Sequence, residues 1–308
     1  MRFSFSRLDA LLLVMTFIWG SNFSIIKSAL TELPELGFNS LRMIIAALLF
    51  AAIIAAREGV GAAAARIDRT DWTRLILLGI LGHCIYQFLF LAGVARTSVA
   101  NSSLIFGCTP VTVALLSAWM GHERLTWPRA AGALLSLAGV IIVVTQARPA
   151  GAARAASMAG DAMVAGAMLS WAIYTVGSRP ILAHHTPLTV TGFTLVIGTA
   201  LYAPFGIPSL LALEWARVST WAWIELVYSA VFALVVAYLI WYTAVQRVGS
   251  SHTSIFSNVV PLVAVVVAAL TLGEPITVRT IAGAAAILSG VALTRLEFGS
   301  AAEGPLEG

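Results

Sequence analysis

The sequence predicts an all-α integral membrane protein made of two related halves. Of its 308 residues, 59% are hydrophobic and 10% are charged, and the mean hydropathy is +0.93, whereas a soluble domain has about 25% charged residues. Apolar stretches of roughly 20 residues, the length at which a helix crosses a bilayer, follow one another along the chain. Matching residues recur at a constant separation of 151 positions, as in Pro110 and Pro261 or Arg96 and Arg247. The chain is therefore expected to contain the same bundle of helices twice.

Ten transmembrane helices are predicted between breaks that are charged or rich in Pro and Gly. Arg2 and Arg7 precede the first stretch, as basic residues precede a secretory signal peptide. The length of this stretch, and the nine further spans behind it, favour a retained helix instead. The predicted spans are residues 8–30, 36–56, 72–93, 99–120, 127–146, 158–179, 187–206, 220–244, 251–272 and 278–295.

The 151-residue separation divides these spans into two groups of five. We assign residues 1–147 to the first repeat, 157–296 to the second and 299–308 to a disordered tail. Because five is odd, the second repeat must enter the membrane from the side opposite to the first. The predicted fold is therefore ten transmembrane helices arranged as two inverted five-helix repeats, a construction typical of secondary transporters.

The distribution of basic residues predicts the orientation of the chain. Most of the 18 Lys and Arg residues, including those of the loop from Arg57 to Arg74, lie on segments that share a side with the N-terminus. The positive-inside rule then places both termini in the cytoplasm. The net charge of +4 is explained by anionic lipid headgroups, so no nucleic acid partner is expected.

A motif is common to the two halves. Each half has a proline within its fourth span, at Pro110 and Pro261, then a Gly/Glu pair, in Gly121-His122-Glu123 and Gly273-Glu274, then a Thr and a Gly-rich fifth span. This pattern resembles the EamA repeat of the drug/metabolite transporter superfamily. Its tandem occurrence is more specific than any single motif.

Two further segments resemble the bacterial aromatic-amino-acid exporters of that superfamily. They are Trp19-Gly20-Ser21-Asn22 and His83-Cys84-Ile85-Tyr86-Gln87. The resemblance implies ten helices and a central cavity shared by the two halves. No cofactor is expected. The resemblance also implies export of aromatic and other neutral amino acids, or of similar small metabolites, across the bacterial inner membrane. Export of another metabolite or drug class is the alternative.

The third span offers polar side chains at mid-membrane depth. His83, Tyr86 and Gln87 are spaced i, i+3, i+4 and share one face of a helix. Lipid cannot satisfy such groups, so they must face protein or a water-filled cavity. Lining of a substrate cavity is preferred here over hydrogen bonding between helices, which is the common structural role of such residues.

Two tryptophans lie in the middle of equivalent spans. Trp19 and Trp171 occupy the first span of each half, and Asn22 and Tyr174 lie one turn away on the same faces. An indole at this depth can stack on an apolar body or hold an ammonium over its face. Plain helix packing accounts for the two indoles about equally well.

Spans four, eight and nine supply the remaining candidates. Pro110 and Pro261 each free a backbone carbonyl and predict a kink, interpreted as a hinge for alternating access, with a static bend as the alternative. Asn101, Ser254 and Asn258 lie in the same two spans, and Asn101 aligns with His252. The candidate substrate-binding residues of the eighth span are Tyr238, the repeat partner of Gln87, and Trp241.

Three charged residues are given structural roles. Glu123 and Glu274 each precede a span whose N-terminus favours an anion. Arg42, the one fixed charge well inside a span, is predicted to snorkel to the interface, with neutralisation of a substrate carboxylate as the alternative.

Small residues in the fifth and tenth spans, among them Gly132 and Gly290, predict close helix contacts. Packing within one chain accounts for these contacts, so a monomer or weak homodimer is expected. The other expected partners are the lipid bilayer and a small-molecule substrate.

The sequence lacks the residue patterns that carboxylate proton relays, ATP hydrolysis, metal binding or catalysis require. No span has a clear mid-membrane carboxylate for a proton relay, although His83 or His252 could serve as one, since the unperturbed pKa of histidine lies in the physiological range. A Walker phosphate loop is absent, and Cys84 and Cys108 suggest neither a disulfide nor a metal site. No catalytic constellation indicates an enzyme. A channel is the remaining alternative, less favoured because no rings of charge explain its selectivity.

Overall fold

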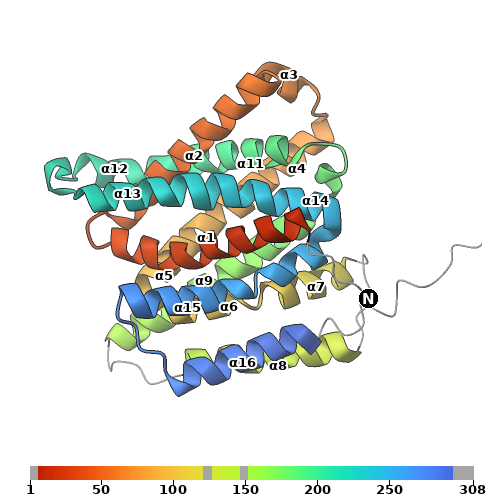
Figure 1. Ribbon diagram of the computed structural model, residues 1–308. Helices are drawn as coiled ribbons and strands as arrows, with labels where there is room; N and C mark the ends of the chain where they lie inside the picture. Colours follow the sequence, from red (N-terminus) through yellow and green to blue (C-terminus); the bar gives the residue numbers. More distant parts are fainter. Residues whose placement is uncertain (1–5, 121–126, 146–151, 294–308) are drawn as a thin grey trace, which may run out of the picture.

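The computed structural model describes residues 6–120, 127–145 and 152–293, and in these parts every regular element is helical (Figure 1). Glu123 and the expected tail 299–308 lie outside the described residues, as does the side chain of His252. The helices of the first half are α1 (Arg7–Ala29), α2 (Glu35–Arg57), α3 (Val60–Ala65), α4 (Arg69–Gly79), the π-helix η1 (Ile80–Ile85), α5 (Tyr86–Arg96), α6 (Val99–Phe106), α7 (Thr109–Trp119) and α8 (Trp127–Val144).

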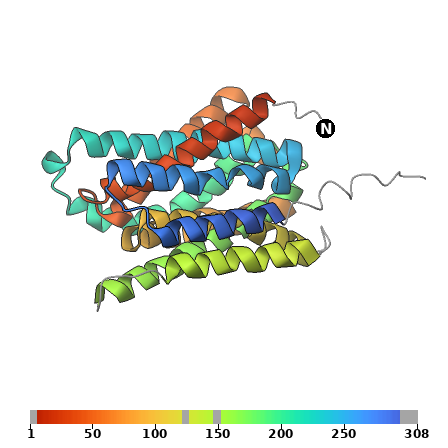
Figure 2. The same ribbon diagram turned by 60° about the horizontal axis from the view of Figure 1, so that its bottom comes forward.

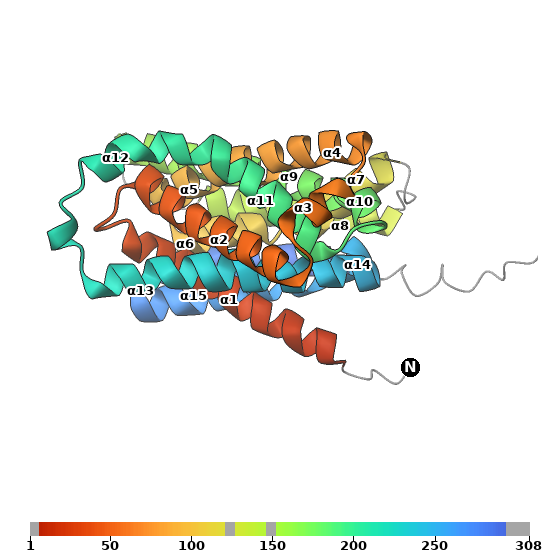
Figure 3. The same cartoon turned by 90° about the horizontal axis from the view of Figure 1, so that it is seen from above.

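The second half repeats this order with additions at its loops. Its elements are α9 (Ala152–Gly177), α10 (Arg179–Leu182), α11 (Pro187–Tyr202), the 3-10 helix η2 (Ala203–Gly206), α12 (Ile207–Leu211), the 3-10 helix η3 (Trp215–Arg217), α13 (Thr220–Tyr228), the π-helix η4 (Ser229–Val236), α14 (Ala237–Phe256), α15 (Val259–Thr271) and α16 (Val278–Leu293). Most of the long helices run along one common direction (Figure 3).

Side chains and backbone geometry fix several helix ends. Ser6 and Asp9 form a reciprocal capping box at α1, and Ser98 accepts a hydrogen bond from the backbone N–H of Asn101 at α6. In α14 the chain turns at Gly249, whose φ of 84° lies in the left-handed region that glycine tolerates best. Gly249 therefore separates the predicted eighth and ninth spans.

Helix occupies all ten ranges predicted as spans, with ends shifted by a few residues. Among the described residues, six stretches are long and apolar enough to cross a membrane by length and composition, namely Arg7–Ala29, Glu35–Arg57, Arg69–Arg96, Val99–Trp119, Pro187–Leu211 and Thr220–Ser250. Shorter apolar helices cover Ala130–Ile142, Val259–Thr271 and Val278–Leu293.

The two halves interlock through their first long helices. Helix α1 packs against η4, α14 and α15 of the second half, and α9 packs against η1, α5, α6 and α7 of the first. Glycines allow the close approach: a Cβ on Gly20 would lie 2.6 Å from Val263 Cβ, and one on Gly93 would lie 2.6 Å from Val164 Cγ2. Each half therefore completes the core of the other.

Helices α8 and α16 form a separate pair along one side of the bundle (Figure 2). A Cβ on Gly139 would lie 2.7 Å from Ile287 Cγ1 and 2.8 Å from the carbonyl oxygen of Gly283. The Ser136 hydroxyl donates to the Ile287 carbonyl at 3.2 Å. The predicted contacts at Gly132 and Gly290 are confirmed, because a Cβ on Gly290 would collide with the Gly132 carbonyl.

Irregular helix occurs at equivalent places in the two halves. Residues 80–85 form η1, and the residues 151 positions later belong to η4. The predicted kinks are present as breaks in the helix: α6 ends at Phe106 before Pro110, and α14 ends at Phe256 before Pro261. The Phe106 carbonyl is satisfied by the Thr109 hydroxyl at 2.6 Å. The two halves thus share their irregular segments as well as their regular helices.

The α8–α16 contact can be tested by substitution. Gly139→Leu should lower the free energy of unfolding by about 1–3 kcal/mol, because the new side chain must separate two helices in backbone contact. Ala285→Leu, at an exposed position of α16, is the matched control and should have little effect. Thermal unfolding in detergent measures both variants, and equal melting temperatures for the two would contradict this packing.

Candidate functional site

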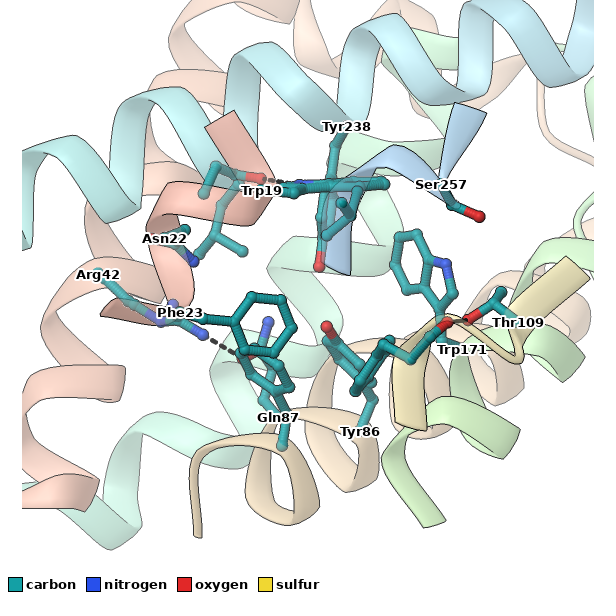
Figure 4. Close-up of a pocket in the computed structure, with 15 residues that line it drawn as sticks. Trp19, Asn22, Phe23, Arg42, Tyr86, Gln87, Thr109, Trp171, Tyr238 and Ser257 are labelled. Atoms are coloured by element: carbon teal, nitrogen blue, oxygen red, sulfur yellow. Dashed lines mark hydrogen bonds between the residues drawn. The ribbon is translucent and has the colours of Figure 1, made fainter. Parts of the chain in front are cut away.

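A cavity lies between the two halves near the middle of the bundle. Its volume is about 60 Å³, and Figure 4 shows side chains from both halves pointing into it. The lining residues are Trp19, Asn22, Phe23, Arg42, Tyr86, Gln87, Phe90, Phe106, Thr109, Trp171, Ala233, Leu234, Tyr238, Ser257 and Val260.

Aromatic side chains make up seven of the 15 residues in the cavity wall. Trp19 and Trp171 meet edge to face, with ring centroids 5.6 Å apart and an interplanar angle of 88°. Tyr86 lies 5.4 Å from Trp171, and Tyr238 lies 5.2 Å from the same ring. One of these contacts is edge to face and the other two are tilted, geometries that aromatic pairs prefer over a face-to-face sandwich. The equivalent tryptophans of the two halves thus meet at the centre of the molecule.

The indole of Trp19 is fixed by a π-helical segment. Its Nε1–H donates to the backbone carbonyl of Ala233 in η4, with 3.1 Å between the two atoms. A π-helix widens the spacing of backbone hydrogen bonds and often occurs at functional sites. Here it leaves a carbonyl accessible to a side chain from the other half.

A hydroxyl and imidazole cluster lies directly behind the cavity wall. His83 Nε2 is 3.2 Å from the hydroxyls of both Tyr174 and Thr194, and these two hydroxyls are 2.7 Å apart. The ring centroid of His83 lies 5.6 Å from that of Tyr238. Gly82 makes room for the Tyr174 ring. His83 and Tyr174 therefore support the cavity rather than line it.

Arg42 is buried, and the prediction that it snorkels to the interface is wrong. Only 1% of the residue is exposed. Its Nε donates to Asn39 Oδ1 at 2.5 Å, Nη1 to Ser229 Oγ at 2.8 Å and Nη2 to Gln87 Oε1 at 2.6 Å. The helix turns Arg42 toward its neighbours, where side chains remote in sequence supply acceptors. The guanidinium thus forms part of the cavity wall.

Half of the predicted binding residues line the cavity: Trp19, Asn22, Tyr86, Gln87, Trp171 and Tyr238. The others lie outside the lining: His83, Asn101, Tyr174, Trp241, Ser254 and Asn258.

Trp241 packs on Trp19, with 5.3 Å between centroids. Asn101 donates to Asp161 Oδ1 at 3.3 Å, towards one end of the bundle. Asn258 precedes α15, and the backbone carbonyl of Ser254 accepts from the Ser257 hydroxyl at 2.7 Å.

Several lining residues were missed by sequence reasoning, chiefly Phe23, Phe106, Thr109 and Ser257. Phenylalanine in an apolar helix gives no local signal of a cavity. Phe90, which also lines the cavity, does have a signal in the sequence, because it is the repeat partner of the predicted residue Trp241.

Two charged side chains bind backbone groups at the end of the bundle where α6 begins, and one of them, Glu274, joins the two halves. The Glu274 carboxylate accepts from the backbone N–H groups of Val99 and Ala100, at 2.9 and 3.2 Å. Lys27 donates to the carbonyls of Val94 and Thr97. An anion at a helix N-terminus was expected for Glu274, but the capped helix is α6 of the first half, not the span that follows Glu274.

A larger cavity of about 580 Å³ lies near the C-terminal end of α2 and the N-terminal end of α11. Its lining comes from α2, α11, α14 and the segments beside them: Ile53, Arg57, Glu58, Thr186, Pro187, Leu188, Leu239, Thr243, Gln246 and Arg247. Among the described residues, no group of three or more His, Cys, Asp or Glu side chains is placed to hold a metal ion.

Comparison with known proteins identifies the family of the chain. The model of the EamA-like transporter family matches twice, over residues 7–145 and 158–296. The chain belongs to this family. It is thus a multi-pass membrane protein of a transporter family, and the two matches correspond to the two sets of helices described above.

Relatives extend over almost the whole chain. An uncharacterized transporter of Archaeoglobus fulgidus is 29% identical, covering 91% of this chain and 95% of the relative. A probable terminal-alkyne amino-acid exporter of Streptantibioticus cattleyicolor is 28% identical, with 91% of each chain covered. A probable amino-acid metabolite efflux pump of Escherichia coli is 28% identical, with 93% and 94% covered. A solved crystal structure with 21% identity shares the fold, with a TM-score of 0.69 over 95% of this chain and 99% of that chain.

The hydrogen bond of Trp19 to η4 is testable. Trp19→Phe keeps an aromatic ring but removes the indole N–H that donates to the Ala233 carbonyl, so the free energy of unfolding should fall by about 1–3 kcal/mol. Trp119→Phe, at a side chain that is 84% exposed, is the matched control and should change it little. Chemical unfolding in detergent, followed by circular dichroism, measures both. A loss no larger for Trp19→Phe than for the control would refute the role of this bond.

Proposed function

We propose that the chain exports amino acids, aromatic and other neutral ones, or similar small metabolites across the bacterial inner membrane by alternating access. The aromatic cavity between the halves carries this proposal, because apolar walls with a few polar groups are typical of small-molecule sites. Two relatives at 28% identity, named as a probable terminal-alkyne amino-acid exporter and a probable amino-acid metabolite efflux pump, support the substrate class.

The proposed architecture is ten membrane-spanning helices in two inverted halves, residues 1–147 and 157–296, with both termini in the cytoplasm. The repeated order of elements and the exchange of α1 and α9 between the halves support it. Rocking of one half against the other would open the cavity to alternate sides of the membrane. The helix breaks before Pro110 and Pro261 are the proposed hinges.

Direct substrate contacts are assigned to the predicted residues that line the cavity. Trp19, Tyr86, Trp171 and Tyr238 would hold the apolar part of the substrate, and Asn22 and Gln87 would bind its polar groups. The supporting roles fall to His83, Tyr174 and Trp241. The remaining proposed residues are Asn101 in α6, Ser254 in the last turns of α14 and Asn258 directly before α15.

Transport by two variants tests this assignment. Trp171→Ala and Tyr86→Ala should each lower the rate of phenylalanine counterflow in liposomes about tenfold or more, because an aromatic contact in a desolvated pocket is lost. Trp221→Ala, at a residue that is 63% exposed, is the matched control and should retain the wild-type rate.

The same preparation separates the alternatives. A carrier gives saturable counterflow and no unitary currents in a planar bilayer. Single-channel currents would replace the carrier with a channel. Saturable counterflow that is unaffected by both cavity variants would remove Trp171 and Tyr86 from the site, whereas failure of a panel of amino acids to exchange would remove the substrate class.

A further inference from the structure

The cavity wall contains a buried positive charge without a matching negative one. The three side chains that accept hydrogen bonds from Arg42 are Asn39, Ser229 and Gln87, and all three are neutral. In the described parts of the chain, no Asp or Glu forms an ion pair with this guanidinium. Dipoles therefore hold Arg42 in place, but its charge is left without a counter-ion.

Such an arrangement is unusual for a residue with a purely structural role. A charge in a low-dielectric interior is unfavourable unless it is paired, and intramembrane Arg residues usually face a partner or a pathway. Neutral side chains of the same length could join α2 to η4 and α5 with less loss of hydration. Since Arg42 lines the central cavity, a ligand in that cavity is the natural source of the missing charge.

Gln87 adds further donors beside Arg42. Its Oε1 accepts from Arg42 Nη2, as the dashed line in Figure 4 shows, and this bond fixes the orientation of the amide. The amide nitrogen is thereby left as the free end, and Gln87 Nε2 is buried with no acceptor in the structure. Unpaired buried donors of this kind lose hydrogen bonding until a ligand supplies an acceptor.

An acceptor without a donor lies on the same wall. Asn22 Oδ1 is buried, lines the cavity and has no hydrogen-bond partner. The cavity therefore has a cationic guanidinium from Arg42, free amide N–H donors from Gln87 and one free carbonyl acceptor from Asn22. Aromatic faces line much of the rest. Guanidinium and amide donors together match the two oxygens of a carboxylate.

We propose that Arg42 and Gln87 form a carboxylate receptor, so that the ligand of the cavity is an apolar or aromatic molecule with a free carboxylate. Asn22 binds an ammonium group where the ligand has one. This inference deepens the proposed function and rests on it for the direction of transport, but not for binding. It makes the carboxylate, rather than the ammonium, the group that the site requires.

Four small probes separate these groups in the purified full-length protein. L-Phenylalanine has both charged groups, 3-phenylpropionate has only the carboxylate, and L-phenylalaninamide and phenethylamine have only the amine. Binding is measured by tryptophan fluorescence and by the shift of the melting temperature. The two carboxylates should bind at least about tenfold more tightly than the two amines, because a buried charge is paired in one case and opposed in the other.

Substitutions then assign the preference to residues. Arg42→Gln should reduce the affinity for both carboxylates about tenfold or more and bring phenylalanine and phenylalaninamide to within about threefold of each other. Gln87→Ala should weaken both carboxylates less and keep the preference. Arg96→Gln, which removes a surface ion pair with Glu35, is the matched control and should leave all four affinities unchanged.

The outcomes distinguish this inference from the proposed function. If the amines bind wild-type protein as well as the carboxylates do, or if none of the four probes binds, the receptor is refuted. If Arg42→Gln binds all probes more weakly by one common factor, its role is structural and the receptor is again refuted. If Arg42→Gln does not fold, the wild-type preference and Gln87→Ala still decide. Selective carboxylate binding without counterflow would support the receptor and refute the exporter.

Discussion

The structure depends on one constraint: every backbone N–H and C=O group of a helix in lipid needs a hydrogen-bond partner within the protein. Where the helices are regular, the backbone supplies those partners itself. At η4 and at the break before α7, side chains add hydrogen bonds to backbone carbonyls. Trp19 Nε1 donates to the Ala233 carbonyl, and the Thr109 hydroxyl donates to the Phe106 carbonyl. Both of these side chains also line the central cavity, so the irregular backbone and the site form one unit.

The exchange of first helices makes the cavity a joint property of both halves. Because α1 packs in the second half and α9 packs in the first, Trp19 and Trp171 come within contact distance although 152 residues separate them. Arg42 strengthens this junction by bonding to Gln87 of its own half and Ser229 of the other. Neither half has a complete cavity without the other.

Composition and the 151-residue separation were enough to predict the helices, their duplication and the breaks near Pro110 and Pro261. They also pointed to six of the residues that line the cavity, since polar groups at mid-span depth must face protein or a cavity rather than lipid. The surroundings of Arg42 were not predictable, because its acceptors Ser229 and Gln87 are distant in sequence. The phenylalanines of the wall were missed because an apolar side chain looks the same against lipid, core or ligand.

The link between Glu274 and α6 has a thermodynamic consequence. A carboxylate that follows α15 completes the hydrogen bonding of a helix in the other half, through the N–H groups of Val99 and Ala100. Any rearrangement that separates the two elements must hydrate one charge and two amides at once, with a loss of about 1.5–3 kcal/mol for each bond to a charged group. This cap therefore acts as a latch between the halves, and its strength depends on how much water reaches that end of the bundle.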